Sequence, residues 1–133
     1  MPKLLTSFAL ITVMIVLTGL GCKKSSTPPP PEEDLKISID AASYTLTPGP
    51  DFSFNLKVES AMPIRGVAIH YTVKGEFDNQ NYPQGPTINT YSSITKITIN
   101  GLPRQKICIC TVTVTSKSKN TNTATTSFRV GYK

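Results

Sequence analysis

The sequence contains no tryptophan and only one histidine, His70, among its 133 residues. A catalytic nucleophile needs a base and an orienting group within hydrogen-bond distance. With a single histidine, the chain has few side chains that could serve as such a base. Segments typical of a serine-hydrolase elbow, a phosphate loop or a calcium loop are also missing. Carboxylates such as Asp40 and Glu76 fall in turns or at the ends of expected strands. We therefore expect a non-catalytic protein without a cofactor or a bound metal.

Cysteine is scarce as well, and two of the three cysteines, Cys108 and Cys110, lie two residues apart. On one strand they point to the same side with α-carbons about 6.5 to 7 Å apart, at or beyond the limit for an unstrained disulfide. We expect two small buried thiols. The alternative is a soft-metal site in which both converge with His70, although zinc prefers four ligands.

The first residues carry the clearest pattern of the chain. Lys3 precedes an apolar run from Leu4 to Leu20, and Gly21-Cys22 follows. A short positive start, an apolar segment and a small residue before a cleavage point are typical of an export signal. Gly21-Cys22 resembles the lipobox of bacterial lipoproteins, and the lysines and prolines that follow resemble lipoproteins of the Bacteroidetes type.

This resemblance implies a signal peptide over residues 1–21 and a lipid on Cys22. The protein would then be held on the outer membrane of a bacterial cell envelope, with the periplasmic and surface sides both open. Leu20 departs from the preferred Ser or Thr of the lipobox, and Gly19 from the preferred Leu. The alternative is an uncleaved anchor, because about seventeen apolar or small residues lie at the lower limit of a membrane span.

A proline-rich segment, residues 22–34, separates Cys22 from the rest of the chain. Its prolines, 28–31, favour an extended polyproline II conformation, so a dozen residues span at most roughly 35 Å. Lys23 and Lys24 would lie at the level of anionic headgroups, where each is attracted by about 1 kcal/mol. We expect a semi-rigid tether. Assigning Cys22 to the lipid also explains the odd number of cysteines.

Residues 35–133 match the commonest size of a single domain. Thr, Ser, Val and Ile are abundant, and apolar and polar residues alternate with a period of two, which indicates half-buried strands. The expected strands cover residues 35–40 with an extension over 44–46, then 52–58, 67–73, 87–91, 96–100, 107–114 and 127–132. Seven such strands predict an all-β fold with two antiparallel sheets packed face to face.

The segment from Ile97 to Pro103, followed by an alternating strand and a polar turn, resembles fibronectin type III and PKD domains. The resemblance implies a seven-stranded immunoglobulin-like β-sandwich. Cys108 stands where that family has an aromatic residue, so the subfamily stays open. The same topology would place loops 59–64 and 116–122 at one end of the sandwich and loop 75–86 at the other.

Loops on a rigid sandwich are a common place for recognition. From Leu35 onward eleven Lys or Arg stand against five Asp or Glu, a balance of +6, and several of the basic residues fall in turns. The candidate binding residues are Phe77, Tyr82, Arg104, Lys117 and Lys119. They predict an adhesion or binding module for a protein or glycan partner, and not for nucleic acid; a carbohydrate-binding accessory module is the alternative. Solvated lysines and aromatic rings packed over the core would give the same pattern.

Overall fold

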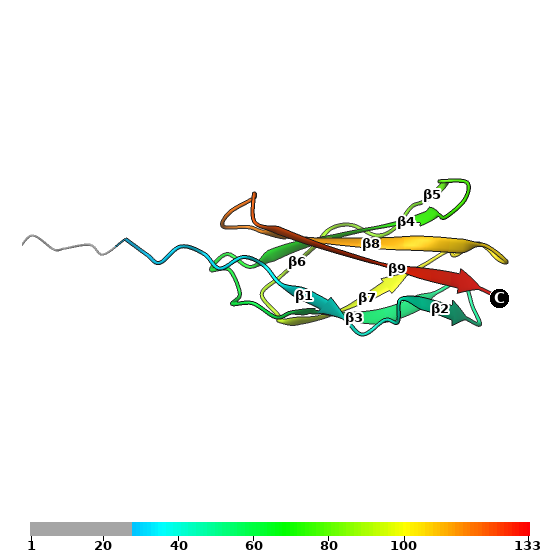
Figure 1. Ribbon diagram of the computed structural model, residues 1–133, viewed down its shortest axis with the longest axis horizontal. Helices are drawn as coiled ribbons and strands as arrows, with labels where there is room; N and C mark the ends of the chain where they lie inside the picture. The colour runs from blue at the N-terminus through cyan, green and yellow to red at the C-terminus, as the bar shows by residue number, and fades with distance from the viewer. Residues whose placement is uncertain (1–27) are drawn as a thin grey trace, which may run out of the picture. The chain divides into compact units, whose positions relative to one another are not determined.

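The computed structural model describes residues 28–133, which form nine β-strands and no helix (Figure 1). Residues from Pro31 onward make one compact unit. Within the described residues there is accordingly no helix capable of crossing a membrane. The expected signal peptide and Cys22 lie outside the described residues.

The first sheet has three antiparallel strands in the order β1-β3-β7. They are β1 (Ile37–Ile39), β3 (Phe52–Val58) and β7 (Ile94–Ile99). In β3 every second residue from Phe54 to Val58 is buried, as the period of two predicts for a strand with one solvated face.

The second sheet has six strands, with β2-β9-β8-β4-β5 in order and β6 also paired to β4. In chain order they are β2 (Tyr44–Thr47), β4 (Val67–Gly75), β5 (Asn81–Tyr82), β6 (Ile88–Thr90), β8 (Ile107–Ser116) and β9 (Thr123–Tyr132). The two sheets do not close into a barrel. The all-β fold with two sheets is confirmed.

The core fills the space between the inner faces of the two sheets. Phe54 of the first sheet meets Phe128 of the second edge to face, with ring centroids 4.9 Å apart, a favoured geometry for an aromatic pair. Cys108 and Cys110 are free thiols of β8 and are completely buried in this core. The prediction that they fill space between the sheets is confirmed.

The expected first strand is in fact two strands that belong to different sheets. Asp40 ends β1 because its carboxylate accepts hydrogen bonds from the backbone N–H and the side-chain amide of Asn55, both at 2.7 Å. After this bend β2 joins the second sheet, where it pairs parallel with β9. The expectation of seven purely antiparallel strands is wrong here, because alternation predicts which face is buried but not which sheet a strand joins.

Candidate functional site

The sandwich has two ends with different features, called here the N-terminal end and the C-terminal end. At the N-terminal end, loops 59–66 and 116–122 lie together (Figure 1), in agreement with what the family resemblance implies for loops 59–64 and 116–122. The Lys117 N–H donates to the Gly66 carbonyl at 3.0 Å, and the Arg65 N–H donates to the Ser118 hydroxyl at 3.1 Å. The last residue, Lys133, lies at the C-terminal end (Figure 1).

The chain also joins the sandwich at the N-terminal end, where the buried side chain of Asn122 holds it. The Asn122 Oδ1 accepts the Leu35 N–H at 2.9 Å, and its Nδ2 donates to Glu32 Oε1 at 2.7 Å and to the Glu33 carbonyl at 2.9 Å. A further bond runs from the Ala61 N–H to Glu33 Oε2 at 3.0 Å. The final residues of the expected tether are therefore fixed to the domain.

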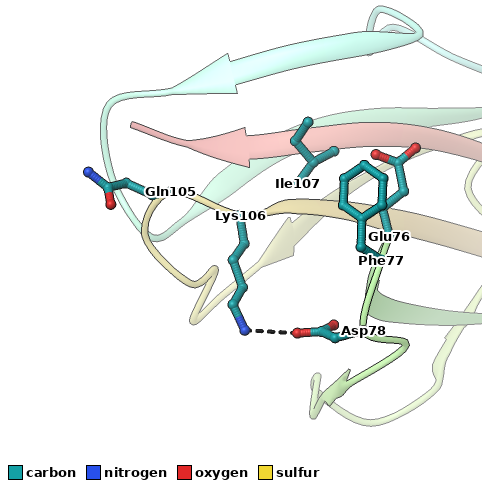
Figure 2. Close-up of a pocket in the computed structure, with 6 residues that line it drawn as sticks. All are labelled: Glu76, Phe77, Asp78, Gln105, Lys106 and Ile107. Carbon is teal, nitrogen blue, oxygen red and sulfur yellow. Dashed lines mark hydrogen bonds and ion pairs between the residues drawn. The ribbon is translucent and has the colours of Figure 1, made fainter.

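A pocket of about 310 Å³ lies at the C-terminal end, between the β4–β5 loop and the β7–β8 loop (Figure 2). We call it the Phe77 pocket. Its lining residues are Glu76, Phe77, Asp78, Gln105, Lys106 and Ile107. The Glu76 N–H donates to the Ile107 carbonyl at 2.9 Å, which attaches the β4–β5 loop to the start of β8.

The β4–β5 loop is a tight turn built around Asp78. Asp78 Oδ1 accepts the Gln80 N–H at 3.1 Å, and Asn79 takes a positive φ of 53°, a conformation that Asn tolerates better than most residues. Gly75 is needed beneath this turn, because a Cβ at position 75 would overlap the Asp78 carboxylate. The turn places Phe77 at its outer edge.

The charges around the pocket are compensated in pairs. Lys106 Nζ bonds Asp78 Oδ2 at 2.8 Å across the pocket (Figure 2), and this contact is the main reason that the pKa of Asp78 is lowered. Arg129 bonds Glu76 Oε2 at 2.7 Å, and Glu76 raises the pKa of Arg129. Both acids are therefore held in ion pairs, which places charges of both signs around the pocket.

The structure divides the five predicted binding residues between the two ends. Phe77 is 86% exposed, whereas Tyr82 is half-buried in β5 and packs against the core. Within residues 28–133 the two rings do not form an aromatic pair. Arg104 is exposed near the pocket, beside Gln105, and Lys117 and Lys119 are exposed at the N-terminal end.

The residues of the soft-metal alternative are not brought together. Cys108 and Cys110 face the core, while His70 is exposed on β4. In the described part of the chain no group of three or more His, Cys, Asp or Glu side chains could hold a metal ion. Burial raises the pKa of both thiols, that of Cys110 to about 12, so neither is a ready thiolate ligand.

A second hollow of about 300 Å³ lies on the outer face of the first sheet, with Asp40, Lys57 and Ile94 among its lining residues. The Asp40 carboxylate already accepts hydrogen bonds from Asn55. The bond from the Asn55 backbone N–H is the main cause that lowers the pKa of Asp40. The Phe77 pocket, which has the exposed Phe77 ring at its rim, is the better candidate for binding.

Sequence reasoning missed several residues that the structure makes prominent. Gln105 and Ile107 line the Phe77 pocket, and Gln105 takes a positive φ of 58° in the β7–β8 loop. Ile64 is the most exposed large apolar side chain of the described residues, at 89%. The Pro63-x-x-Gly66 spacing is a turn signal that could have indicated an exposed tip there.

A scan against protein-family models finds no match, and searches of curated proteins and of solved structures find no significant similarity to this chain.

Proposed function

We propose that the protein is a lipid-anchored envelope lipoprotein whose immunoglobulin-like sandwich is a non-catalytic binding module for a protein or glycan. The strand order β1-β3-β7 against β2-β9-β8-β4, with the leading segment divided between the two sheets, supports the immunoglobulin-like assignment. The Gly21-Cys22 pair supports the anchor. Neither a cofactor nor a metal is part of the proposal.

One observation carries the binding role: the chain joins the sandwich at the end opposite the Phe77 pocket. Asn122 fixes Glu32 at the N-terminal end, so the free tether runs from Cys22 to Pro31. These ten residues span at most roughly 31 Å as polyproline II. An anchor on Cys22 then holds the N-terminal end near the membrane and presents the pocket on the far side of the domain.

The chemistry of the pocket suits a partner with both apolar and polar groups. Phe77 offers an exposed ring, and exposed aromatic residues are frequent anchors of binding interfaces. Asp78, Lys106 and Gln105 also line the pocket, with donors and acceptors that can fix an orientation. A glycan stacked on Phe77 would use the same groups, and this is the second candidate.

The anchor is tested by cell fractionation of the native chain and of Cys22→Ala. We expect the native chain in the membrane fraction and the variant either released or retained as an uncleaved precursor of higher mass. A variant that is processed and membrane-bound like the native chain would contradict lipid anchoring on Cys22.

The binding role is tested by placing a photocrosslinking residue at position 77 in the anchored chain. We expect a discrete adduct with a protein or a glycan, and none when the same residue replaces Ile94, which is 55% exposed at the edge of the first sheet. Retention on envelope polysaccharide that Phe77→Ala abolishes would select the glycan. Equal crosslinking at both positions, or none at position 77, would contradict binding at the pocket.

A further inference from the structure

The N-terminal end carries an exposed surface of mixed apolar and basic character that the proposed binding role does not use. The Gly66 N–H donates to the Pro63 carbonyl at 2.8 Å, which makes Ile64 and Arg65 the central residues of a β-turn. Ile64 is 89% exposed at its tip. Covering so exposed an isoleucine with an apolar phase lowers the free energy, because its apolar surface is removed from water.

Tyr91 and two lysines complete this surface, which we call the Ile64 surface: Ile64, Arg65, Tyr91, Lys117 and Lys119. The Tyr91 ring lies against Gly66, so close that a Cβ at position 66 would meet it at 3.0 Å. Tyr91 itself is 69% exposed. The bond from the Lys117 N–H to the Gly66 carbonyl places the lysine loop beside the same turn.

In the part of the chain that the structure describes, the basic residues of the Ile64 surface have no acidic partner. Within residues 28–133 the ion pairs are formed by other side chains. Of the acids at this end, Glu33 and Glu59 are paired with Lys36 and Lys57, at 3.8 and 2.9 Å, and Glu32 accepts a hydrogen bond from the Asn122 amide at 2.7 Å. Arg65, Lys117 and Lys119 are thus free to attract an anionic surface.

We propose that the Ile64 surface docks on an anionic lipid bilayer, with Ile64 inserted and Tyr91 at the headgroup level. The chemistry of this surface matches that of the membrane interface: one apolar residue forms the tip, a tyrosine lies beside it, and Lys and Arg surround both. The inference rests on the proposed anchor, because the tether joins the sandwich at this same end and holds the surface within roughly 31 Å of the lipid.

Tryptophan fluorescence tests this docking without background, because the chain contains no tryptophan. Ile64→Trp places the probe at the tip, and Phe77→Trp is the matched control, since the two native side chains are 89% and 86% exposed. The full chain carrying each probe is reconstituted in vesicles of zwitterionic and anionic phospholipid, with and without lipids brominated on their acyl chains.

We expect brominated lipid to quench the Ile64→Trp probe and its emission to shift to the blue, with no change for Phe77→Trp. Adding Lys117→Gln and Lys119→Gln should lower the docked fraction at limiting anionic lipid, with a docking constant reduced on the order of 30-fold. Equal quenching at both positions, or none at position 64, would overturn the proposal.

Flotation of the same samples separates this proposal from the anchor. A chain that floats in high salt but shows no quenching at position 64 in low salt is anchored but not docked, which overturns the proposal and leaves the anchor in place. A chain that does not float lacks the anchor, and anionic vesicles added to it still decide docking: quenching of the Ile64→Trp probe at low salt supports it, and no quenching overturns it.

Discussion

At the scale of single residues, Asp78 determines the shape of the Phe77 pocket. Its two carboxylate oxygens accept the Gln80 N–H and the Lys106 ammonium, so one side chain closes its own turn and ties it to the β7–β8 loop. This carboxylate lies directly over Gly75, where a Cβ would overlap it. A change at any of these positions therefore alters the support beneath Phe77.

Lys106→Gln should raise the pKa of Asp78 toward its ordinary value, because the contact with Lys106 is the main cause that lowers it. Since the folded-state pKa lies below the unfolded one, the pair stabilises the fold above the ordinary carboxyl range, and this contribution is lost as pH falls through the folded pKa. Both side chains are largely exposed, so the effect on stability is small. Carboxyl-carbon NMR titration measures the change.

Asp40 is the internal control for this titration, because Asn55 and not a lysine lowers its pKa. Its titration should be the same in the native chain and in Lys106→Gln. An Asp78 that also titrates identically in both proteins would show that the ion pair does not form in solution.

At the scale of elements, β7 is one of the two edge strands of the first sheet, and side chains cover both of its ends. Interstrand bonds alternate along an antiparallel pair, so Ile94, Lys96, Thr98 and Asn100 direct their backbone groups away from β3. The Ser92 hydroxyl donates to the Ile94 carbonyl at 2.7 Å. The unpaired backbone groups of an open edge strand can pair with another chain. The side-chain hydrogen bonds at the ends of β7 shorten the stretch that is open to such pairing.

Gln84 covers the other end of β7 by acting as one residue of a neighbouring strand. Its Oε1 accepts the Asn100 N–H and its Nε2 donates to the Asn100 carbonyl, both at 3.0 Å. If such a bond contributes about 1 kcal/mol, Gln84→Ala should accelerate amide exchange at Asn100 about fivefold. NMR-detected hydrogen exchange measures this.

Gln84→Glu is the matched variant, because it keeps an acceptor for the Asn100 N–H and loses only the donor. Exchange at Asn100 should stay closer to the native rate in this variant than in Gln84→Ala. The Ile97 amide, directed toward β3, should be unaffected by both. Native exchange at Asn100 in Gln84→Ala would contradict the role of Gln84 in covering the edge.

The elements also show how far the sequence predicts the fold. The alternation of β3 predicts its bounds, 52–58, and that of β4 and β8 predicts most of theirs, because one face of each is buried against the other sheet. The structure of loop residues is harder to predict from the sequence. Tyr82 forms the two-residue strand β5, and no period is visible in so short a segment.

Only part of the candidate site could be predicted from the sequence. Phe77 is identifiable as an aromatic residue in a long polar loop, but its neighbours Gln105 and Ile107 come from a segment nearly thirty residues further along. Their proximity depends on the pairing of β4 with β8, which places Gly75 opposite Cys108. Such register is a property of the folded sheet and not of either segment alone.

At the scale of the whole molecule, the two ends of the sandwich have separate chemistry. The Ile64 surface shares its end with the attachment of the chain. The β4–β5 loop, which lines the Phe77 pocket, lies at the other end with the C-terminus (Figure 1). With the proposed docking and binding roles, this separation would let one domain contact a membrane and a partner at the same time. It depends on a fixed point of attachment, which Asn122 provides.

Asn122→Ala should both destabilise the domain and release its N-terminal residues. The side chain is only 6% exposed, and its loss leaves the Leu35 N–H without its acceptor. Burying an unpaired amide group and losing two further bonds costs about 2 kcal/mol, a fall in Tm of roughly 8 to 16 °C for a domain of this size. Thermal unfolding measures the loss, and hydrogen exchange at Leu35 reports the release.

Asn120→Ala, an exposed change in the same loop, should leave both quantities unchanged. Asn122→Asp separates the two roles of the side chain: its carboxylate still accepts the Leu35 N–H, but it cannot donate to Glu32 and repels that carboxylate. Exchange at Leu35 should then remain slow while the residues before it become accessible to protease. If Asn122→Ala leaves protease resistance and exchange as in the native chain, the attachment point lies elsewhere, and the opposed placement of tether and pocket loses its support.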